Sequence, residues 1–64
     1  MQREFFIYTA DGEKCTVKED GIESTHEFPD ILAALNFVHQ QRNGEKVMLT
    51  SFDPTGRVVF TEIV

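Results

Sequence analysis

The 64-residue chain is poor in cysteine and in basic residues, and each shortage argues against a class of protein. Cys15 is the only cysteine, so no disulfide can form within the chain, and a lone thiol fits a reducing compartment better than secretion. Six basic residues stand against eleven acidic ones, a net charge of −5. Because nucleic-acid binders usually carry a basic patch, this balance argues against DNA, RNA and anionic membranes as partners.

Long apolar runs and sorting signals are missing as well. No stretch approaches the ~20 apolar residues of a membrane span, and the first residues, MQREFF, do not form a basic-then-apolar leader. The chain also lacks an N-x-Ser/Thr glycosylation sequon. We therefore expect one cytoplasmic domain over residues 1–64, with a thin stability margin that a second subunit would widen.

The first half of the chain has the pattern of consecutive β-hairpins. Aromatic and β-branched residues over Glu4–Thr9 predict a strand, and Asp11-Gly12 predicts a turn after it. Lys14–Glu19 alternates like a half-exposed strand, with Asp20-Gly21 as a second turn. The segment of residues 22–28 is short and largely polar, so whether it forms an edge strand stays open.

The apolar period changes from that of a strand to that of a helix after Pro29, a residue that suits a first helical turn. Asn43-Gly44 predicts the end of this helix after three to four turns. Asp53-Pro54-Thr55-Gly56 then predicts the turn of a closing hairpin. The order ββ(β)αββ predicts an α+β fold: an antiparallel sheet of four strands, or five, with one helix packed on one face. The helical apolar positions are Ile31, Ala34, Leu35 and Val38.

Both faces of the predicted sheet are apolar, although one helix can cover only one of them. Successive side chains of a strand point to opposite faces, and apolar residues are consecutive over 5–8, 47–49 and 58–60. Which set lies under the helix stays open, because a one-residue shift of register exchanges them. Exposed apolar patches usually mark interfaces, so we expect a homodimer with faces packed or edges paired, rather than a monomer with a wet sheet. The candidate interface residues are Phe6, Tyr8, Met48, Phe52, Val59 and Ile63.

These features predict a small non-enzymatic interaction or accessory module. A protein partner would meet its polar surface, which includes Glu23, Glu27 and Asp30. The alternative is a module that binds single-stranded nucleic acid by stacking bases on an aromatic sheet face. The aromatic residues available for that purpose are Phe5, Phe6, Tyr8, Phe52 and Phe60.

The sequence contains no compact constellation of catalytic or metal-binding residues. Cys15, His26 and His39 fall on three different elements without the short spacing of a metal site, so we expect no metal and no cofactor. Cys15 could be a nucleophile beside a histidine, but it alternates with Val17 and fits a small buried hydrophobe better. A hydrolase or thiol enzyme would need a cleft built across a dimer interface. We expect no catalytic residue within one chain.

Three short stretches resemble a family of small uncharacterised bacterial proteins, a domain of unknown function. They are the V-K-x-x-G step at Val17-Lys18-Glu19-Asp20-Gly21, the alanine-rich helix at Ala33-Ala34-Leu35, and the G-R hairpin at Gly56-Arg57-Val58. The resemblance extends over nearly the whole chain and implies a ββαββ fold. It implies no established activity and supplies no catalytic residues.

Overall fold

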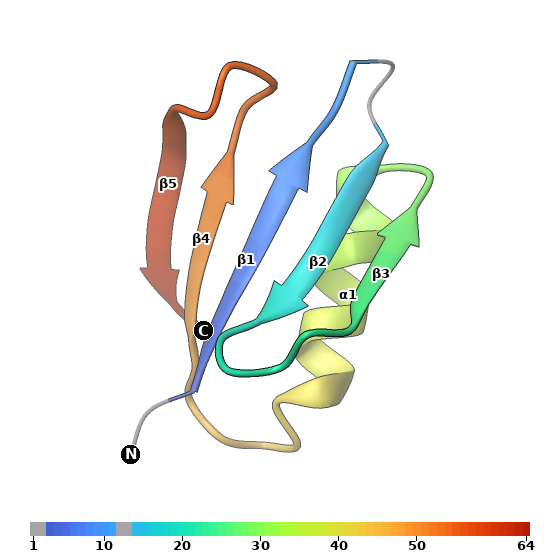
Figure 1. The fold of residues 1–64 in the computed structure, drawn as a ribbon. Helices are drawn as coiled ribbons and strands as arrows, with labels where there is room; N and C mark the ends of the chain where they lie inside the picture. Colours follow the sequence, from blue (N-terminus) through green and yellow to red (C-terminus); the bar gives the residue numbers. More distant parts are fainter. Residues whose placement is uncertain (1–2, 12–13) are drawn as a thin grey trace.

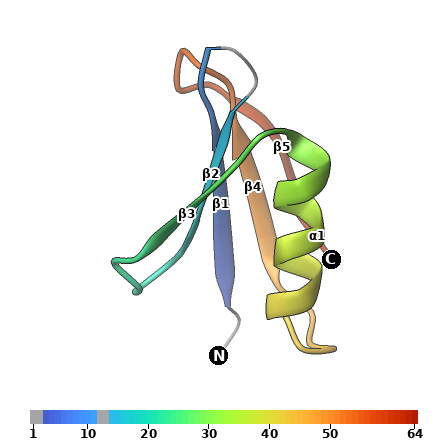
Figure 2. The same cartoon turned by 90° about the vertical axis from the view of Figure 1, so that its right-hand side faces the viewer.

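Five strands and one helix form the part of the chain that the computed structural model describes, residues 3–11 and 14–64 (Figure 1). The strands make one sheet in the order β3-β2-β1-β4-β5, and the helix lies on one side of it (Figure 2). The predicted α+β fold is confirmed, and the segment left open over residues 22–28 contributes an edge strand. The elements are β1 (Glu4–Thr9), β2 (Cys15–Glu19), β3 (Thr25–Phe28), α1 (Ile31–Gln41), β4 (Met48–Phe52) and β5 (Val58–Ile63).

The sheet is mostly antiparallel, but the pair at its centre, β1 and β4, runs parallel. Its register sets Glu4 beside Met48 and Tyr8 beside Phe52, and the Met48 amide donates to the Arg3 carbonyl at 3.0 Å. The other neighbours, β1–β2, β2–β3 and β4–β5, are antiparallel. The chain therefore folds as a three-stranded meander followed by a closing hairpin. Helix α1 connects the two along the chain, and the parallel pairing of β1 with β4 joins them into one sheet.

The predicted turns and helix ends that fall within the described residues lie close to where the sequence places them, but Pro29 precedes the N-cap of α1 and does not occupy its first turn. In the Asp11-Gly12 turn, Gly12 lies outside the described residues. In the second turn Gly21 adopts a φ of +82°, a left-handed conformation that glycine tolerates. Asp30 is the N-cap of α1, and its carboxylate accepts from the Ala33 amide at 2.9 Å. Asn43 and Gly44 both have left-handed φ values after the last helical turn, so they end the helix as predicted.

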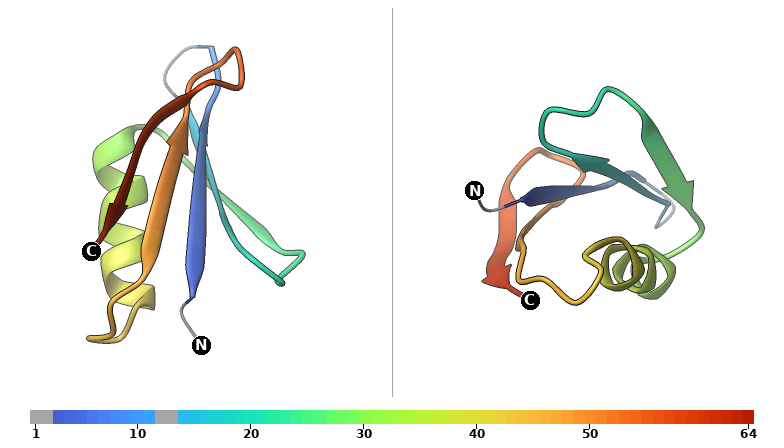
Figure 3. Two further views of the ribbon diagram at one scale, coloured as in Figure 1. Left: turned by 90° about the vertical axis from the view of Figure 1, so that its left-hand side faces the viewer. Right: turned by 90° about the horizontal axis from the view of Figure 1, so that it is seen from below.

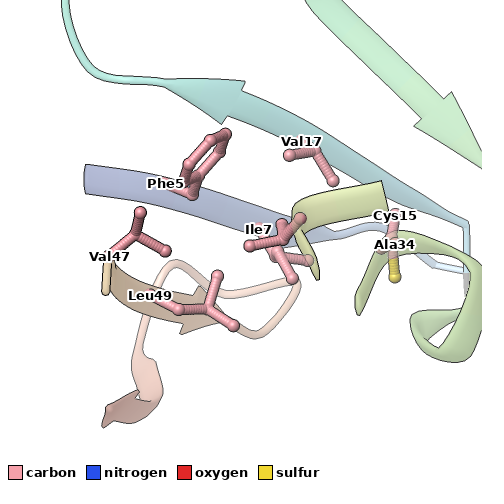
Figure 4. Packing of buried hydrophobic residues seen from close by; sticks show 8 residues of the cluster. Phe5, Ile7, Cys15, Val17, Ala34, Val47 and Leu49 are labelled. Atoms are coloured by element: carbon pink, nitrogen blue, oxygen red, sulfur yellow. The ribbon is translucent and has the colours of Figure 1, made fainter. Parts of the chain in front are cut away.

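The core forms between α1 and one set of alternating strand residues (Figure 4). Phe5 and Ile7 of β1 point toward the helix, and the β1–β2 register sets Ile7 beside Val17 and Thr9 beside Cys15. Cys15 is 1 % exposed, which confirms it as a buried small residue. The face that the sequence left undecided is therefore settled: Phe6 and Tyr8 lie on the other side of the sheet. The buried apolar residues are Phe5, Ile7, Cys15, Val17, Ala34, Val38, Val47 and Leu49.

A bulge in the last hairpin changes the alternation that was expected in β5. Phe60 pairs with Ser51, but the next pair joins Phe52 to Val58, so Val59 is an extra residue without a partner on β4. Val58 consequently shares the side of Phe52, away from the helix. The expectation that Val59 lies there with Ile63 is wrong, because Val59 lines a hollow on the helix side of the sheet.

The helix sits off the centre of the sheet, over β1, β2 and β3 rather than over β4 and β5 (Figure 3). Phe37 on its outer flank packs in tilted geometry against Phe28 and His26 of β3, with ring centroids 5.0 Å and 4.6 Å apart. The helix side of β4 and β5 is covered by Phe60 and Val64, which pack against the core while remaining partly exposed. This offset leaves room beside the start of α1.

Arg3 joins β1 to β2 and to the end of the helix. Its Nε and one terminal nitrogen donate to the two Glu19 carboxylate oxygens at 2.6 Å and 2.9 Å, and its other terminal nitrogen donates to the Gln41 carbonyl at 2.8 Å. The guanidinium carbon also lies 5.2 Å from the centroid of the Phe5 ring. The hydrogen bonds from Arg3 hold the pKa of Glu19 below its ordinary value.

Candidate functional site

The side of the sheet away from the helix carries an apolar patch over β1, β4 and β5. Cross-strand neighbours share a face, so the register places Met48 beside Ile63 and Phe52 beside both Tyr8 and Val58. The exposed fractions reach 43 % for Tyr8, 57 % for Ile63 and 58 % for Val58. We name this patch the apolar sheet face. Its residues are Phe6, Tyr8, Met48, Phe52, Val58 and Ile63.

An aromatic cluster forms the centre of the apolar sheet face. The Tyr8 and Phe52 rings are stacked, with centroids 5.0 Å apart and planes 8° from parallel. Phe6 lies 6.5 Å from Tyr8 and 6.3 Å from Phe52, in tilted geometry. These separations are within the range of favourable aromatic pairs, so the three rings form a preordered surface.

The rest of this sheet face, on β2 and β3, is polar. Lys18 lies beside Phe6, and Thr16 lies between Tyr8 and Glu27. The proposed partner-binding carboxylates do not gather here: Glu27 lies on this face, whereas Asp30 caps the helix on the opposite side. The face is thus divided into an apolar half toward β5 and a polar half toward β3.

Five of the six candidate interface residues lie together on the apolar sheet face. Val59 is the exception, because the bulge turns it toward the helix side. Sequence reasoning missed Val58, which takes its place beside Phe52. The proposed base-stacking platform is also reduced, since Phe5 lies in the core and Phe60 packs against it.

The outer edge of β5 presents backbone groups to which no other described strand is paired. Val47 and Val64 exchange two backbone hydrogen bonds of 2.9 Å, and such doubly bonded pairs recur at every second residue of an antiparallel ladder. Glu62 and Phe60 therefore direct their amides and carbonyls at β4. Thr61 and Ile63 direct theirs outward, which makes this edge a template for another strand.

A separate hollow of about 370 Å³ lies on the helix side, between the start of α1 and the turn that joins β4 to β5. Figure 1 shows these two segments at the same end of the sheet. Cys15 and Ser51, 1 % and 3 % exposed, lie at its floor. The Thr9 hydroxyl is 3.7 Å from the Cys15 sulfur. The remaining lining residues are Asp30, Ile31, Asp53, Pro54, Val59 and Phe60.

Asp53 organises the turn at the mouth of this hollow. Its Oδ1 accepts from the Thr55 hydroxyl at 2.6 Å and from the Thr55 and Arg57 amides at 2.9 Å each. The Gly56 amide donates to the Asp53 carbonyl at 3.0 Å. The hydrogen bond from the Thr55 hydroxyl, followed by that from the Arg57 amide, lowers the pKa of Asp53.

Acid is expected to weaken the fold through Glu19 and Asp53. Both have a pKa below the ordinary value in the folded chain, so the unfolded chain takes up protons first as the pH falls. The stability they contribute is present above the unfolded-state pKa of about 4 and is lost as the pH falls through the folded-state values. Urea unfolding midpoints should therefore drop below pH ~4. Glu19→Gln should make this drop shallower, and an unchanged slope would contradict the assignment.

The two histidines lie on different elements, β3 and α1, and each contacts a neighbouring side chain. His26 lies on the edge strand β3 against Phe37, and His39 accepts a hydrogen bond from the Arg42 Nε at 3.3 Å in the last helical turn. Neither lies beside Cys15. Within residues 3–11 and 14–64, no three His, Cys, Asp or Glu side chains gather as metal ligands.

Comparisons with protein-family models, with curated proteins and with solved structures gave no match. The resemblance to small bacterial proteins consequently stays a prediction. In the described part of the chain, α1 is too short to cross a bilayer.

Proposed function

We propose that this protein is a cytoplasmic homodimeric interaction module whose β5 edge pairs with the β5 edge of a second copy. The observation that carries the proposal is the coincidence of two features on one strand. β5 has outward-directed backbone groups along an edge, and its Val58 and Ile63 border the apolar sheet face. Pairing at this edge would join two apolar faces into one surface.

The spacing of the outward groups fits self-pairing about a two-fold axis. Thr61 at the axis would face Thr61 of the second copy and exchange two hydrogen bonds with it. Ile63 would then lie in register with Val59 of the second copy, so an apolar residue flanks the axis on each side. In this register Glu62 lies beside Phe60 of the second copy and not beside a second Glu62, so no like charges stand directly opposite. The interface is isologous, as a dimer requires.

Backbone hydrogen bonds between the two edges, worth about 1 kcal/mol each, and burial of the apolar side chains beside them, at about 25 cal/mol per Å², supply the driving force. A small domain gains much from it, since its own core supplies only ~3–5 kcal/mol. Repulsion between two copies that each carry a charge of −5 opposes association. Salt screens such repulsion, so the dimer should strengthen as ionic strength rises.

A second candidate is single-stranded nucleic acid stacked on Phe6, Tyr8 and Phe52, the rings of the aromatic cluster. The charges on the same face disfavour it: Lys18 stands against Glu27 there, and the chain as a whole is acidic. A labelled oligonucleotide at low salt separates the two functions. Micromolar binding that weakens steeply with salt would favour nucleic acid over the dimer.

The test of the dimer is light-scattering mass across a dilution series, together with hydrogen exchange of the backbone amides. We expect a two-subunit mass that falls toward one subunit on dilution. We also expect protection of the Thr61 and Ile63 amides, which point away from β4 within one chain. A two-subunit mass with rapid exchange at these amides would refute edge pairing, and a single-subunit mass at all concentrations would refute the dimer.

A further inference from the structure

The hollow beside the start of α1 has the size, and the combination of apolar and polar lining residues, found in small-molecule sites. Its volume of about 370 Å³ is within the usual range of roughly 300–1,000 Å³. Ile31, Pro54 and Phe60 give it apolar walls. Such sites combine a mainly apolar lining with a few polar groups that orient the ligand, and polar groups occur here at both the floor and the rim.

Ser51 provides the polar group at the floor. Only 3 % of the residue is exposed, and it lines the hollow. The described residues form no side-chain hydrogen bond with it, and none of their fully buried side-chain nitrogen or oxygen atoms lacks a partner. Its hydroxyl is therefore reached from the hollow. Because buried hydroxyls normally have a partner, this one can accept or donate a hydrogen bond to a molecule that fills the space.

Two carboxylates provide the polar groups at the rim. Asp30 uses Oδ1 to cap the helix and Asp53 uses Oδ1 to hold its turn, so each has a second oxygen to offer. Neither carboxylate forms an ion pair with a described residue. The ion pair found among the described residues joins Arg3 to Glu19. A carboxylate pairs most strongly with a charged N–H donor. The two rim positions therefore favour a cation at the mouth.

The geometry points to this hollow as a binding site for a small primary amine with an apolar body, a function beyond the proposed dimer. The ammonium group lies at the rim between Asp30 and Asp53, and the apolar body lies against Ile31 and Phe60. The far end of the molecule reaches the Ser51 hydroxyl. An anion is disfavoured by both carboxylates and by the net charge of −5.

Three six-carbon probes that differ only in their end group test the site: hexylammonium, 1-hexanol and hexanoate. Each is titrated at constant ionic strength into the full chain, and amide and methyl shifts are followed by NMR. We expect saturable shifts in the millimolar range at Ile31, Ser51 and Phe60, in the order hexylammonium, hexanol, hexanoate. One screened contact with a carboxylate at about 4 Å corresponds to a preference of about five-fold for the ammonium over the alcohol. Equal affinities, or shifts centred on the apolar sheet face, would overturn the proposal.

A charge-neutral variant separates the rim from general electrostatics. Asp30→Asn with Asp53→Asn removes both charges but keeps an oxygen acceptor for the cap and the turn. It should bind hexanol as before and lose the preference for hexylammonium. The matched control is Asp20→Asn with Glu23→Gln, which removes two charges from the connection between β2 and β3. Figure 1 shows this connection at the opposite end of the sheet. A control that loses the preference equally would also overturn the proposal.

Discussion

Ile7→Ala is expected to leave most of the protein unfolded at room temperature. Ile7 is fully buried between β2, β4 and the helix (Figure 4). Truncation of such a side chain costs about 2–5 kcal/mol, which combines the lost transfer free energy with that of the cavity left behind. A core of this size supplies only ~3–5 kcal/mol. The far-UV circular dichroism spectrum and the urea unfolding curve should lose their folded signal and baseline.

The matched control for this substitution is Ile22→Ala. Ile22 is 48 % exposed and lies outside the core cluster, so the same loss of carbon atoms should change the free energy of unfolding by only about 0.5 kcal/mol. Both variants are compared at one protein concentration, because association would stabilise the folded chain by mass action. Equal effects at the two positions would contradict the assignment of the core.

Thr61→Pro is expected to convert the dimer into a folded monomer. Proline removes the Thr61 amide hydrogen, which points outward and has no role in the β4–β5 ladder, and proline is tolerated on a strand edge. At the two-fold axis the substitution removes one hydrogen bond from each copy, so the dimer loses two, worth ~1 kcal/mol each. The dissociation constant should rise by about thirty-fold or more, as measured by light scattering on dilution.

Thr61→Ala is the control for the proline substitution, because it keeps the amide hydrogen. It removes only the hydroxyl, which lies 3.4 Å from the Thr50 hydroxyl on the exposed face. This variant should dimerise like the parent chain. If alanine disrupts the dimer as much as proline does, side chains rather than the backbone edge hold the two copies together, and face-to-face packing replaces edge pairing. Circular dichroism establishes that each variant is folded.

Local sequence patterns were sufficient to predict the helix and the strands of this fold. Alternation placed Cys15 and Val17 on one face of β2, and Asn43-Gly44 ended the helix as predicted. The face of β1 that lies under the helix could also have been inferred. Cys15 and Val17 are the apolar pair of β2, and the register of the first hairpin aligns them with Ile7 and Thr9. The polar residues Thr16 and Lys18 then fall beside Phe6 and Tyr8.

The remaining features depend on contacts that no local pattern carries. The parallel pairing of β1 with β4 joins residues far apart in sequence, and hairpin signals describe only neighbouring strands. β5 contains no glycine or proline from which the bulge at Val59 could have been predicted. Ser51 had no distinguishing signal, because a serine in an alternating strand is ordinary. Its position at the floor of a hollow follows from the offset of the helix.

The parallel pair at the centre of the sheet also governs how quickly this protein can fold. The hairpins can form from adjacent residues, but the core is complete only when Glu4 reaches Met48 and the strands between them align. Closing so long a loop lowers the conformational entropy of the chain before the contacts that offset this loss have formed. Folding is therefore paced by the meeting of β1 and β4. During synthesis, Phe5, Phe6 and Ile7 leave the ribosome long before their central partner strand, and a chaperone that shields such segments would meet them first.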